Sequence, residues 1–328
     1  MVGEKMNPIE VTIGIDIGGT NTVLGFVSRD GTCLAETSMP TMSQEPAAKY
    51  FVRLHEKIEE ANRSLPGNFV VKGIGIGAPN ANYYHGTVET PPNLKWEGVT
   101  NVVDILHQYY DFPIAITNDA NAAAIGEMVF GSGKGLKHFV VITLGTGLGS
   151  GIIVDGRLLY GADGFAGEIG HTIVDPAGRV CGCGRKGCLE TYVSANGIRR
   201  TVAEMICNLT TPSELRKVSF EECTSKLIYD AAMRGDKIAL EAFAYTGEIL
   251  GMKLSDTVAH LSPEAIILFG GLASAGKLIF EPTSNSLERH LLGIFKNKVK
   301  ILPSGLPEGN SAVIGASALI WHEIDRVI

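Results

Sequence analysis

The amino-acid sequence predicts an α/β protein built from two similar domains, and three observations support this fold class. The 328 residues are enough for two hydrophobic cores, since a domain usually takes about 100–200 residues. A content of 45% hydrophobic and 19% charged residues, with 40 glycines, is typical of a soluble globular chain rather than a disordered or fibrous one. A unit of strand, glycine turn and strand also occurs twice, which favours a duplicated domain.

The first copy of this unit lies near the N-terminus. Residues 11–16 and 23–27 are predicted to be strands, because they are largely apolar and are separated by a Gly-Gly-Thr turn at 18–20. A further turn is expected at 29–31. The segment therefore predicts a hairpin closed by a glycine turn.

Helices and strands alternate between the two copies. The predicted elements are a helix over 45–63, a strand over 71–77, a helix over 102–110 and a strand over 113–117. The last strand runs into Asn118, Asp119 and an alanine-rich helix.

The second copy and its flanking elements complete the chain. We expect strands over 139–144 and 151–154 around a glycine turn at 145–149, helical structure over 195–262, a strand over 265–269 and a C-terminal helix from Ala312. We place a small N-terminal α/β domain at 1–117, joined by the C-terminal helix at about 312–328. A large α/β domain is placed at 118–311.

Three glycine-rich turns follow apolar strands. They contain Gly18, Gly19 and Thr20, then Gly145, Thr146 and Gly147, and finally Gly270 and Gly271. Glycine tolerates positive φ and lets backbone N–H groups approach a phosphate closely. One such turn would be an ordinary hairpin turn, but three of them indicate a phosphate site. The glycines at 131–135 and 73–77 lack the spacing of a P-loop or a dinucleotide fingerprint.

Two aspartates stand where apolar strands end. Asp16 could hold Mg²⁺ through water, since Mg²⁺ keeps much of its hydration shell, or it could cap the turn. Asp119 is a candidate catalytic residue that accepts the proton of a hydroxyl group, or alternatively a helix N-cap. The helix N-terminus is expected to lower the pKa of Asp119 and make it a poor base. That is tolerable, because orienting the hydroxyl matters more in phosphoryl transfer than early deprotonation.

A cysteine cluster predicts a metal site. Three of the six cysteines, Cys181, Cys183 and Cys188, fall within eight residues and follow His171. Cys₃His is a typical ligand set of a closed structural zinc site, with no position left for water. Free thiols are the alternative.

Glycines and carboxylates surround this cluster. Gly182, Gly184 and Gly187 allow the tight turns that bring three thiolates to one ion. Glu168 lies three residues before His171 and Glu190 lies two after Cys188, so a metal would fix the backbone that presents both acids. Their carboxylates suit sugar hydroxyls, although solvated acids are the alternative.

Charge and hydropathy exclude several classes of protein. The net charge of −7 argues against nucleic-acid binding. No stretch approaches the roughly 20 apolar residues that span a bilayer, and residues 1–10 lack the apolar core of a signal peptide. We therefore expect a cytoplasmic protein with no membrane partner.

These motifs together resemble the ROK family (repressors, open reading frames, kinases) of the sugar kinase/Hsc70/actin superfamily. The resemblance covers nearly the whole chain, and the motifs occur in the family's order. It implies an actin-like fold of two domains with a cleft between them, and a small zinc-binding motif. It also implies that the three glycine turns and Asp16 bind ATP and Mg²⁺.

The resemblance further implies the roles of individual residues. Asp119 would be the catalytic base, and sugar hydroxyls would be bound by Asn118, Asp119, Glu168, His171 and Glu190. The histidine of the family binds zinc with one ring nitrogen and approaches the sugar with the other. The loops that contain Asn80 and Asn93 resemble loops that close on the sugar from the small domain in family glucokinases. Most family kinases are homodimers.

The function expected from this resemblance is that of an ATP-dependent hexose kinase, with glucose as the favoured sugar. N-acetylmannosamine, allose and fructose remain alternatives, because kinases for these sugars share the motifs. Family repressors carry a helix-turn-helix of tens of residues before the first phosphate motif, whereas 15 residues precede Asp16 here. A repressor or a non-catalytic sugar sensor is therefore less favoured.

Overall fold

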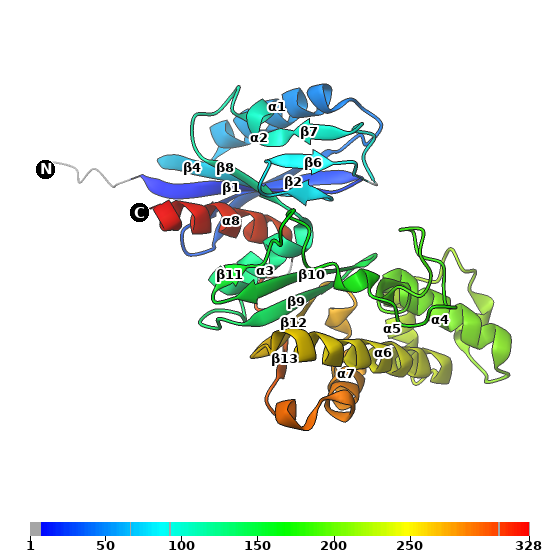
Figure 1. Cartoon of the computed structure of the whole chain (residues 1–328). Helices are drawn as coiled ribbons and strands as arrows, with labels where there is room; N and C mark the ends of the chain where they lie inside the picture. Colours follow the sequence, from blue (N-terminus) through cyan, green and yellow to red (C-terminus); the bar gives the residue numbers. More distant parts are fainter. Residues whose placement is uncertain (1–7, 66, 92, 308, 328) are drawn as a thin grey trace, which may run out of the picture. The chain divides into compact units, whose positions relative to one another are not determined.

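The computed structural model describes residues 8–65, 67–91, 93–307 and 309–327, which form two compact units (Figure 1). Unit 1 consists of the chain up to Gly135, Leu158–Ala166 and the chain from Gly305 onward. Unit 2 consists of Leu136–Arg157 and Gly167–Ser304. Each unit has its own hydrophobic core.

Unit 1 is built on a five-stranded sheet. Its strand order is β3 (Cys33–Pro40), β2 (Asn21–Ser28), β1 (Ile9–Ile17), β4 (Phe69–Gly77) and β8 (Ile114–Thr117). The first three strands form an antiparallel meander, while β4 runs parallel to β1 and β8 runs parallel to β4. The hairpin predicted at the N-terminus is thereby confirmed.

Helix α8 (Ser311–Val327) lies against one face of this sheet at backbone distance (Figure 1). Gly14 of β1 and Gly75 of β4 are register partners. A Cβ added to them would lie 2.0 Å from the carbonyl oxygen of Val313 and 1.8 Å from that of Ala316. Glycine alone fits at both positions, so these glycines serve helix packing.

The core of unit 1 fills the other face of the sheet. Tyr50, Phe51 and Leu54 of α1 (Ala47–Ser64) are fully buried there, beside α2 (Val102–Leu106). The helix predicted over 102–110 is shorter than expected, because residues after Leu106 continue as turns. A small sheet of β5 (Ala81–Asn82), β6 (Thr87–Glu89) and β7 (Val99–Asn101) was not predicted.

Unit 2 repeats the sheet of unit 1. Its strand order is β11 (Arg157–Leu158, where the chain passes from unit 2 to unit 1), β10 (Leu148–Val154), β9 (Phe139–Leu144), β12 (Ala265–Phe269) and β13 (Lys300–Pro303). β10 is antiparallel to β9, β12 is parallel to β9, and β13 is parallel to β12, as in the corresponding strands of unit 1. The predicted duplication is confirmed.

The helices of unit 2 follow in the second half of the chain. They are α4 (Ala195–Asn208), α5 (Ser225–Met233), α6 (Lys237–Leu261) and α7 (Lys277–His290). The long helices α6 and α7 pack closely, since a Cβ on Gly251 would lie 2.3 Å from the carbonyl oxygen of Thr283. Over the described parts of the chain, no helix combines the length and apolar character needed to cross a bilayer.

Helix α3 (Asp119–Val129) belongs to unit 1. It packs on α8, where a Cβ on Gly315 would lie 2.7 Å from the carbonyl oxygen of Ala122. We expected a domain boundary after Thr117, whereas the first segment of unit 1 ends at Gly135. Helix α3 accounts for most of this difference.

Candidate active site and metal centre

The predicted site residues fall into two groups, one in each unit. Unit 1 carries Asp16, Gly18, Gly19, Thr20, Asn80, Asn93, Asn118 and Asp119. Unit 2 carries Gly145, Thr146, Gly147, Glu168, His171, Cys181, Cys183, Cys188, Glu190, Gly270 and Gly271.

Asp16 and Asp119 lie at the same edge of the unit 1 sheet. Asp16 is the register partner of Gly77 on β4, which in turn is the partner of Thr117 on β8. These strands are parallel, so their carboxyl ends meet, and Asp119 follows Thr117 by two residues. A Cβ added to Gly77 would lie 3.9 Å from Asp16 Oδ1 and 3.7 Å from Asp119 Cα. The Cβ position of Gly77 thus lies at van der Waals distance from both aspartates, which places them side by side.

The start of α3 is fixed by the asparagines of its motif. Asn118 is the N-cap, because its Oδ1 accepts a hydrogen bond from the backbone N–H of Asn121 at 2.7 Å. The Asn121 side chain donates to Thr117 Oγ1 at 3.2 Å. Asp119 Oδ1 accepts from the N–H of Ala120 at 2.9 Å. The alternative that Asp119 is the cap is therefore wrong.

The surroundings of the two aspartates raise the pKa of both carboxyl groups. Asp119 keeps an exposed surface, yet desolvation by the protein around it raises its pKa despite the hydrogen bond from Ala120. The lowered pKa expected from the helix N-terminus is wrong, because desolvation outweighs that effect. Burial, and then repulsion by Asp119, raise the pKa of Asp16 to about 6. Two such acids in one place are typical of a functional site.

The first glycine turn is held by Thr41, the residue that follows β3. The Thr41 hydroxyl donates to the carbonyl oxygen of Gly18 at 2.7 Å, and the Thr41 N–H donates to that of Thr20 at 2.8 Å. The turn also lies against a predicted sugar loop, since a Cβ on Gly19 would lie 3.0 Å from Asn93 Cβ. Pro92, which precedes this asparagine, lies outside the described residues.

Asn80 closes its own loop. Its backbone has a φ of +52°, and its side-chain amide donates to the carbonyl oxygens of Glu89 at 3.2 Å and Thr90 at 3.1 Å. The side chain is exposed. The amide nitrogen therefore serves the loop, and only the carbonyl oxygen is left as a possible sugar ligand.

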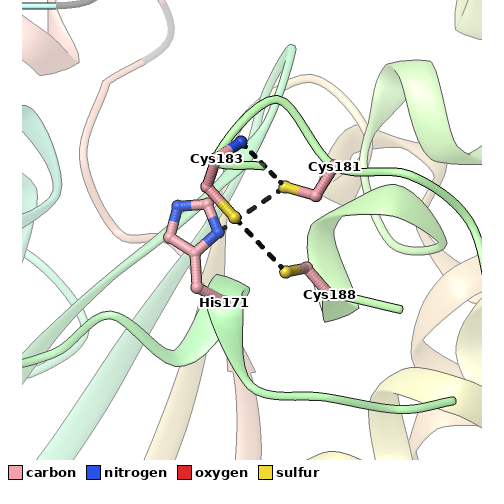
Figure 2. A group of neighbouring side chains, drawn as sticks. All are labelled: His171, Cys181, Cys183 and Cys188. Carbon is pink, nitrogen blue, oxygen red and sulfur yellow. Dashed lines mark hydrogen bonds between the residues drawn. The ribbon is translucent and has the colours of Figure 1, made fainter. Parts of the chain in front are cut away.

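His171, Cys181, Cys183 and Cys188 converge on one point in unit 2 (Figure 2). Their ligand atoms all lie within 4.8 Å of one another. The sulfurs of Cys183 and Cys188 are 3.6 Å apart, and Cys181 Sγ is 3.8 Å from His171 Nδ1. A tetrahedron with bonds of about 2.3 Å has edges of about 3.8 Å, so the residues fit a zinc ion.

The backbone of the cluster depends on two of the three predicted glycines. Gly184 and Gly187 have φ of +87° and +73°, and a Cβ on Gly187 would lie 1.7 Å from the carbonyl oxygen of Asp175. Gly182 has no positive φ and lies in open space. The prediction that all three glycines make tight turns is therefore confirmed for Gly184 and Gly187 alone.

The two ring nitrogens of His171 face different groups. Nδ1 lies near Cys181 and 3.7 Å from Glu190 Oε1, whereas Nε2 lies 3.9 Å from Glu168 Oε2. The Cys181 thiol donates to Glu190 Oε1 at 2.9 Å. The ring can thus bind a metal through Nδ1 while Nε2 stays on the side of Glu168.

The three thiols differ in acidity. Burial raises the pKa of Cys181 and of Cys188. The backbone N–H of Arg185 lowers the pKa of Cys183 to about 6. A coordinated thiol is deprotonated outright. Cys183 is therefore the thiol of the three that ionises most readily.

The glycine turns of unit 2 combine packed and open positions. A Cβ on Gly147 would lie 2.8 Å from Glu190 Oε2, and one on Gly270, at a φ of +98°, would lie 2.9 Å from the carbonyl oxygen of Leu144. Gly145 and Gly271 have no atom within 4 Å of such a Cβ. Gly147 and Gly270 are thus closely packed against the protein, whereas Gly145 and Gly271 leave room for a ligand. A phosphate-binding loop requires such open backbone positions.

Three supporting residues were missed from the sequence. Thr41 was missed because β3 was not predicted. Gly77 was seen as the end of a strand and as part of an interval with the wrong spacing, but not as a neighbour of the two aspartates, and Ser194 was not noticed. Ser194 caps α4 and also donates to the carbonyl oxygen of Glu190 at 2.7 Å. A serine just before a predicted helix is a signal that could have found it.

Known proteins share both the sequence and the fold of this chain. The ROK family pattern matches residues 12–323. A glucokinase of Thermotoga maritima is 33% identical over 95% of this chain and 98% of its own. A xylose repressor of Caldicellulosiruptor bescii is 30% identical over 95% of this chain and 78% of its own.

A solved structure supports the same relationship. It is a ROK family glucokinase from Streptomyces griseus in complex with glucose and AMPPNP, with a TM-score of 0.79 and 33% identity over 94% of this chain and 98% of that one. The expected actin-like α/β fold is confirmed by this match. With a family pattern that spans nearly every described residue, the chain belongs to the ROK family.

Proposed function

We propose that this chain is an ATP-dependent hexose kinase that phosphorylates glucose. The observation that carries the proposal is the pair Asp16 and Asp119 at one edge of three parallel strands, with Gly77 between them. The glucokinases among the relatives support a sugar kinase, and their identity of about 33% favours glucose.

Asp119 would act as the general base. Its raised pKa makes the carboxylate a stronger proton acceptor than an ordinary aspartate, and its hydrogen bond from Ala120 fixes its orientation. The carboxylate would orient the sugar hydroxyl and accept its proton as the phosphoryl group transfers.

ATP and Mg²⁺ would be bound by the residues at the strand ends. Phosphate oxygens would suit the open glycines Gly145 and Gly271 together with the Gly18–Thr20 turn. A hydrated Mg²⁺ would suit Asp16, because the charge of the ion offsets the cost of ionising this carboxyl group. Bound Mg²⁺ supplies charge neutralisation at the transferring phosphate.

The zinc site would be structural. Four protein ligands fill a tetrahedron, so the ion would hold Glu190 and His171 in place. In this proposal one hydroxyl of the sugar meets Asp119. The other hydroxyls of the same sugar would be bound by Asn118, Glu168, His171 and Glu190. The loops of Asn80 and Asn93 would complete its binding.

The test of catalysis is Asp119→Asn. We expect turnover to fall by about 10²–10⁴-fold while sugar binding is retained, because Asn keeps the shape and loses the charge. ADP release and calorimetric binding of glucose measure the two effects. Asp111→Asn, at an exposed aspartate just before β8, is the control and should retain activity. More than half of wild-type turnover in Asp119→Asn would exclude this residue as the base.

The choice of sugar is tested by a panel. We expect kcat/KM for glucose to exceed that for mannose, fructose, allose and N-acetylmannosamine at fixed ATP. A misplaced hydroxyl leaves a buried acceptor unpaired, which costs about 1–3 kcal/mol, or roughly 5–150-fold. A higher value for any other sugar would reject glucose.

One observation favours a second candidate, a sugar-responsive regulator: the 30% identity to a xylose repressor. Glucose-dependent ADP release would reject a purely regulatory role. A cytoplasmic homodimer remains part of the proposal, and size-exclusion chromatography with light scattering tests the dimer.

A further inference from the structure

Arg179 is a buried cation in unit 2 with no part in the proposed chemistry. It is 8% exposed, and all five N–H groups of its guanidinium have acceptors. Nε and Nη2 donate to the two carboxylate oxygens of Glu204 at 2.8 and 2.5 Å. Nη2 also donates to Thr201 Oγ1 at 3.0 Å, and Nη1 donates to the carbonyl oxygens of Thr191 at 2.7 Å and Gly197 at 3.1 Å.

These acceptors lie beside the proposed sugar ligand Glu190. Thr191 directly follows it in the 3₁₀ turn Leu189–Thr191, and Gly197 lies in the first turn of α4. The Arg179 guanidinium also stacks on the Tyr192 ring, with 4.4 Å between its central carbon and the ring centroid. The backbone N–H of Arg179 donates to the Tyr192 hydroxyl at 3.2 Å. One side chain therefore fixes the chain on the C-terminal side of Glu190.

The same segment holds the second glycine turn. The N–H of Ala195, at the start of α4, donates to the carbonyl oxygen of Gly145 at 2.9 Å. Glu190 Oε2 lies 2.8 Å from the Cβ position of Gly147. Arg179 thus supports the place where the sugar ligand meets the phosphate turn.

None of these contacts involves a metal ligand. The cluster is closed by its own turns, with the Cys181 N–H donating to the carbonyl oxygen of Arg185 at 2.9 Å and Ile173 bridging to Cys188. Loss of the guanidinium would therefore release the Glu190 backbone without removing a zinc ligand.

We propose that Arg179 is a positioning residue that sets the affinity for the sugar by fixing the Glu190 backbone against the Gly145–Gly147 turn. The inference rests on the proposed function, in which Glu190 binds a sugar hydroxyl. Lysine cannot replace it, because an ammonium group has three donors and no planar fork.

The test variant is Arg179→Lys, assayed by steady-state kinetics. We expect KM for glucose to rise on the order of ten-fold with kcat changed by about two-fold or less, because an interaction common to ground and transition states is weakened. Zinc content should stay at one per chain, as measured by elemental analysis. This split separates positioning from a general loss of folded enzyme, which would lower kcat alone.

Arg216→Lys is the matched control. Like Arg179, Arg216 donates to backbone carbonyl oxygens, in its case those of Ile206, Leu209 and Thr211, but it does so at the far end of α4. It should lose some thermal stability and keep the wild-type KM. Glu204→Gln is the second variant should Arg179→Lys fail to fold, since Glu204 is half exposed. It removes the ion pair and one of the two carboxylate oxygens that orient the guanidinium, so KM should again rise.

An unchanged KM for glucose in folded Arg179→Lys would overturn the inference and leave the kinase proposal intact. If that variant does not fold, an unchanged KM in Glu204→Gln would have the same meaning. An equal rise in Arg216→Lys, or loss of zinc in Arg179→Lys, would also overturn it. A wild-type chain that neither binds nor phosphorylates a hexose would overturn both proposals.

Discussion

Asp16 is ionised at neutral pH against the preference of its surroundings. Its pKa of about 6 in the folded protein lies above the ordinary value of 3.8. Between these values the folded state binds the proton more tightly than the unfolded state, so the free energy of unfolding falls as the pH rises from about 4 to 6. Above pH 6 the full cost of the buried charge remains. This cost is typical of a residue kept for function rather than for stability.

Asp16→Asn should therefore stabilise the protein while it abolishes activity. At pH 7, without Mg²⁺, we expect a gain of about 1–2 kcal/mol, below the roughly 3 kcal/mol of a full two-unit shift because Asp16 is only partly buried. At pH 4 the gain should vanish. Urea unfolding at both pH values measures it.

Asp30→Asn supplies a control of opposite sign. The Ser28 hydroxyl, followed by the Thr32 N–H, lowers the pKa of Asp30, so its stabilising contribution is present at pH 7 and is lost as the pH falls. The substitution should weaken the protein slightly at pH 7. Equal stability of Asp16→Asn and wild type at pH 7 would show that Asp16 is not desolvated.

At the scale of secondary-structure elements, the sequence predicted best where an apolar run is buried on both faces. The strands at 139–144 and 265–269 match β9 and β12 because all or nearly all of their residues are buried. β3 was missed because its burial alternates and its residues are mostly small or polar. α7 was missed because Pro282 lies inside it, and β13 because it is a short edge strand.

The candidate site was predictable to the same degree. The Cys₃His ligands follow from local spacing, and Asp16 and Asp119 follow from the strand ends. The raised pKa of Asp119 could not be predicted, because it depends on desolvation by residues distant in sequence. The contacts of Arg179 were beyond prediction for the same reason, since they reach residues 12 to 25 positions away.

The zinc-binding segment should be an ordered element only with its metal. We expect one zinc per chain, and Cys183→Ser should lose it and lower the free energy of unfolding by about 3 kcal/mol or more, as expected for a ligand present at several hundred times its Kd. Activity should fall because Glu190 loses its neighbours. Elemental analysis and thermal unfolding measure these effects.

Cys207→Ser is the control for the zinc prediction. Cys207 is exposed near the end of α4, outside the cluster, so this variant should keep both metal and stability. Fully active, unchelated wild-type protein that contains no zinc would contradict the prediction.

At the scale of the whole molecule, the two units differ in how the chain builds them. Unit 1 is assembled from three separate segments, and its last segment supplies α8, which covers Gly14 and Gly75. Unit 2 contains all the predicted zinc ligands. Loss of α8 should therefore affect the units unequally.

Truncation before Ser311 should unfold unit 1 and leave unit 2 folded. We expect the shortened chain to bind one zinc and to resist proteolysis over unit 2, while cleavage sites open throughout unit 1 and phosphoryl transfer ceases. Limited proteolysis with mass spectrometry, together with metal analysis, tests this. Protection of unit 1 in the truncated chain would show that α8 is dispensable.

The contact of α8 with Gly14 and Gly75 also bears on the order of events during synthesis. The sheet that begins at β1 is translated first, yet the helix that seals it is translated last, after the whole of unit 2. At about 5–20 residues per second, the glycine-lined face waits on the order of ten seconds or more for its cover. Unit 1 thus finishes folding only after unit 2 has been translated, and a nascent chain carries its unsealed sheet until α8 becomes available.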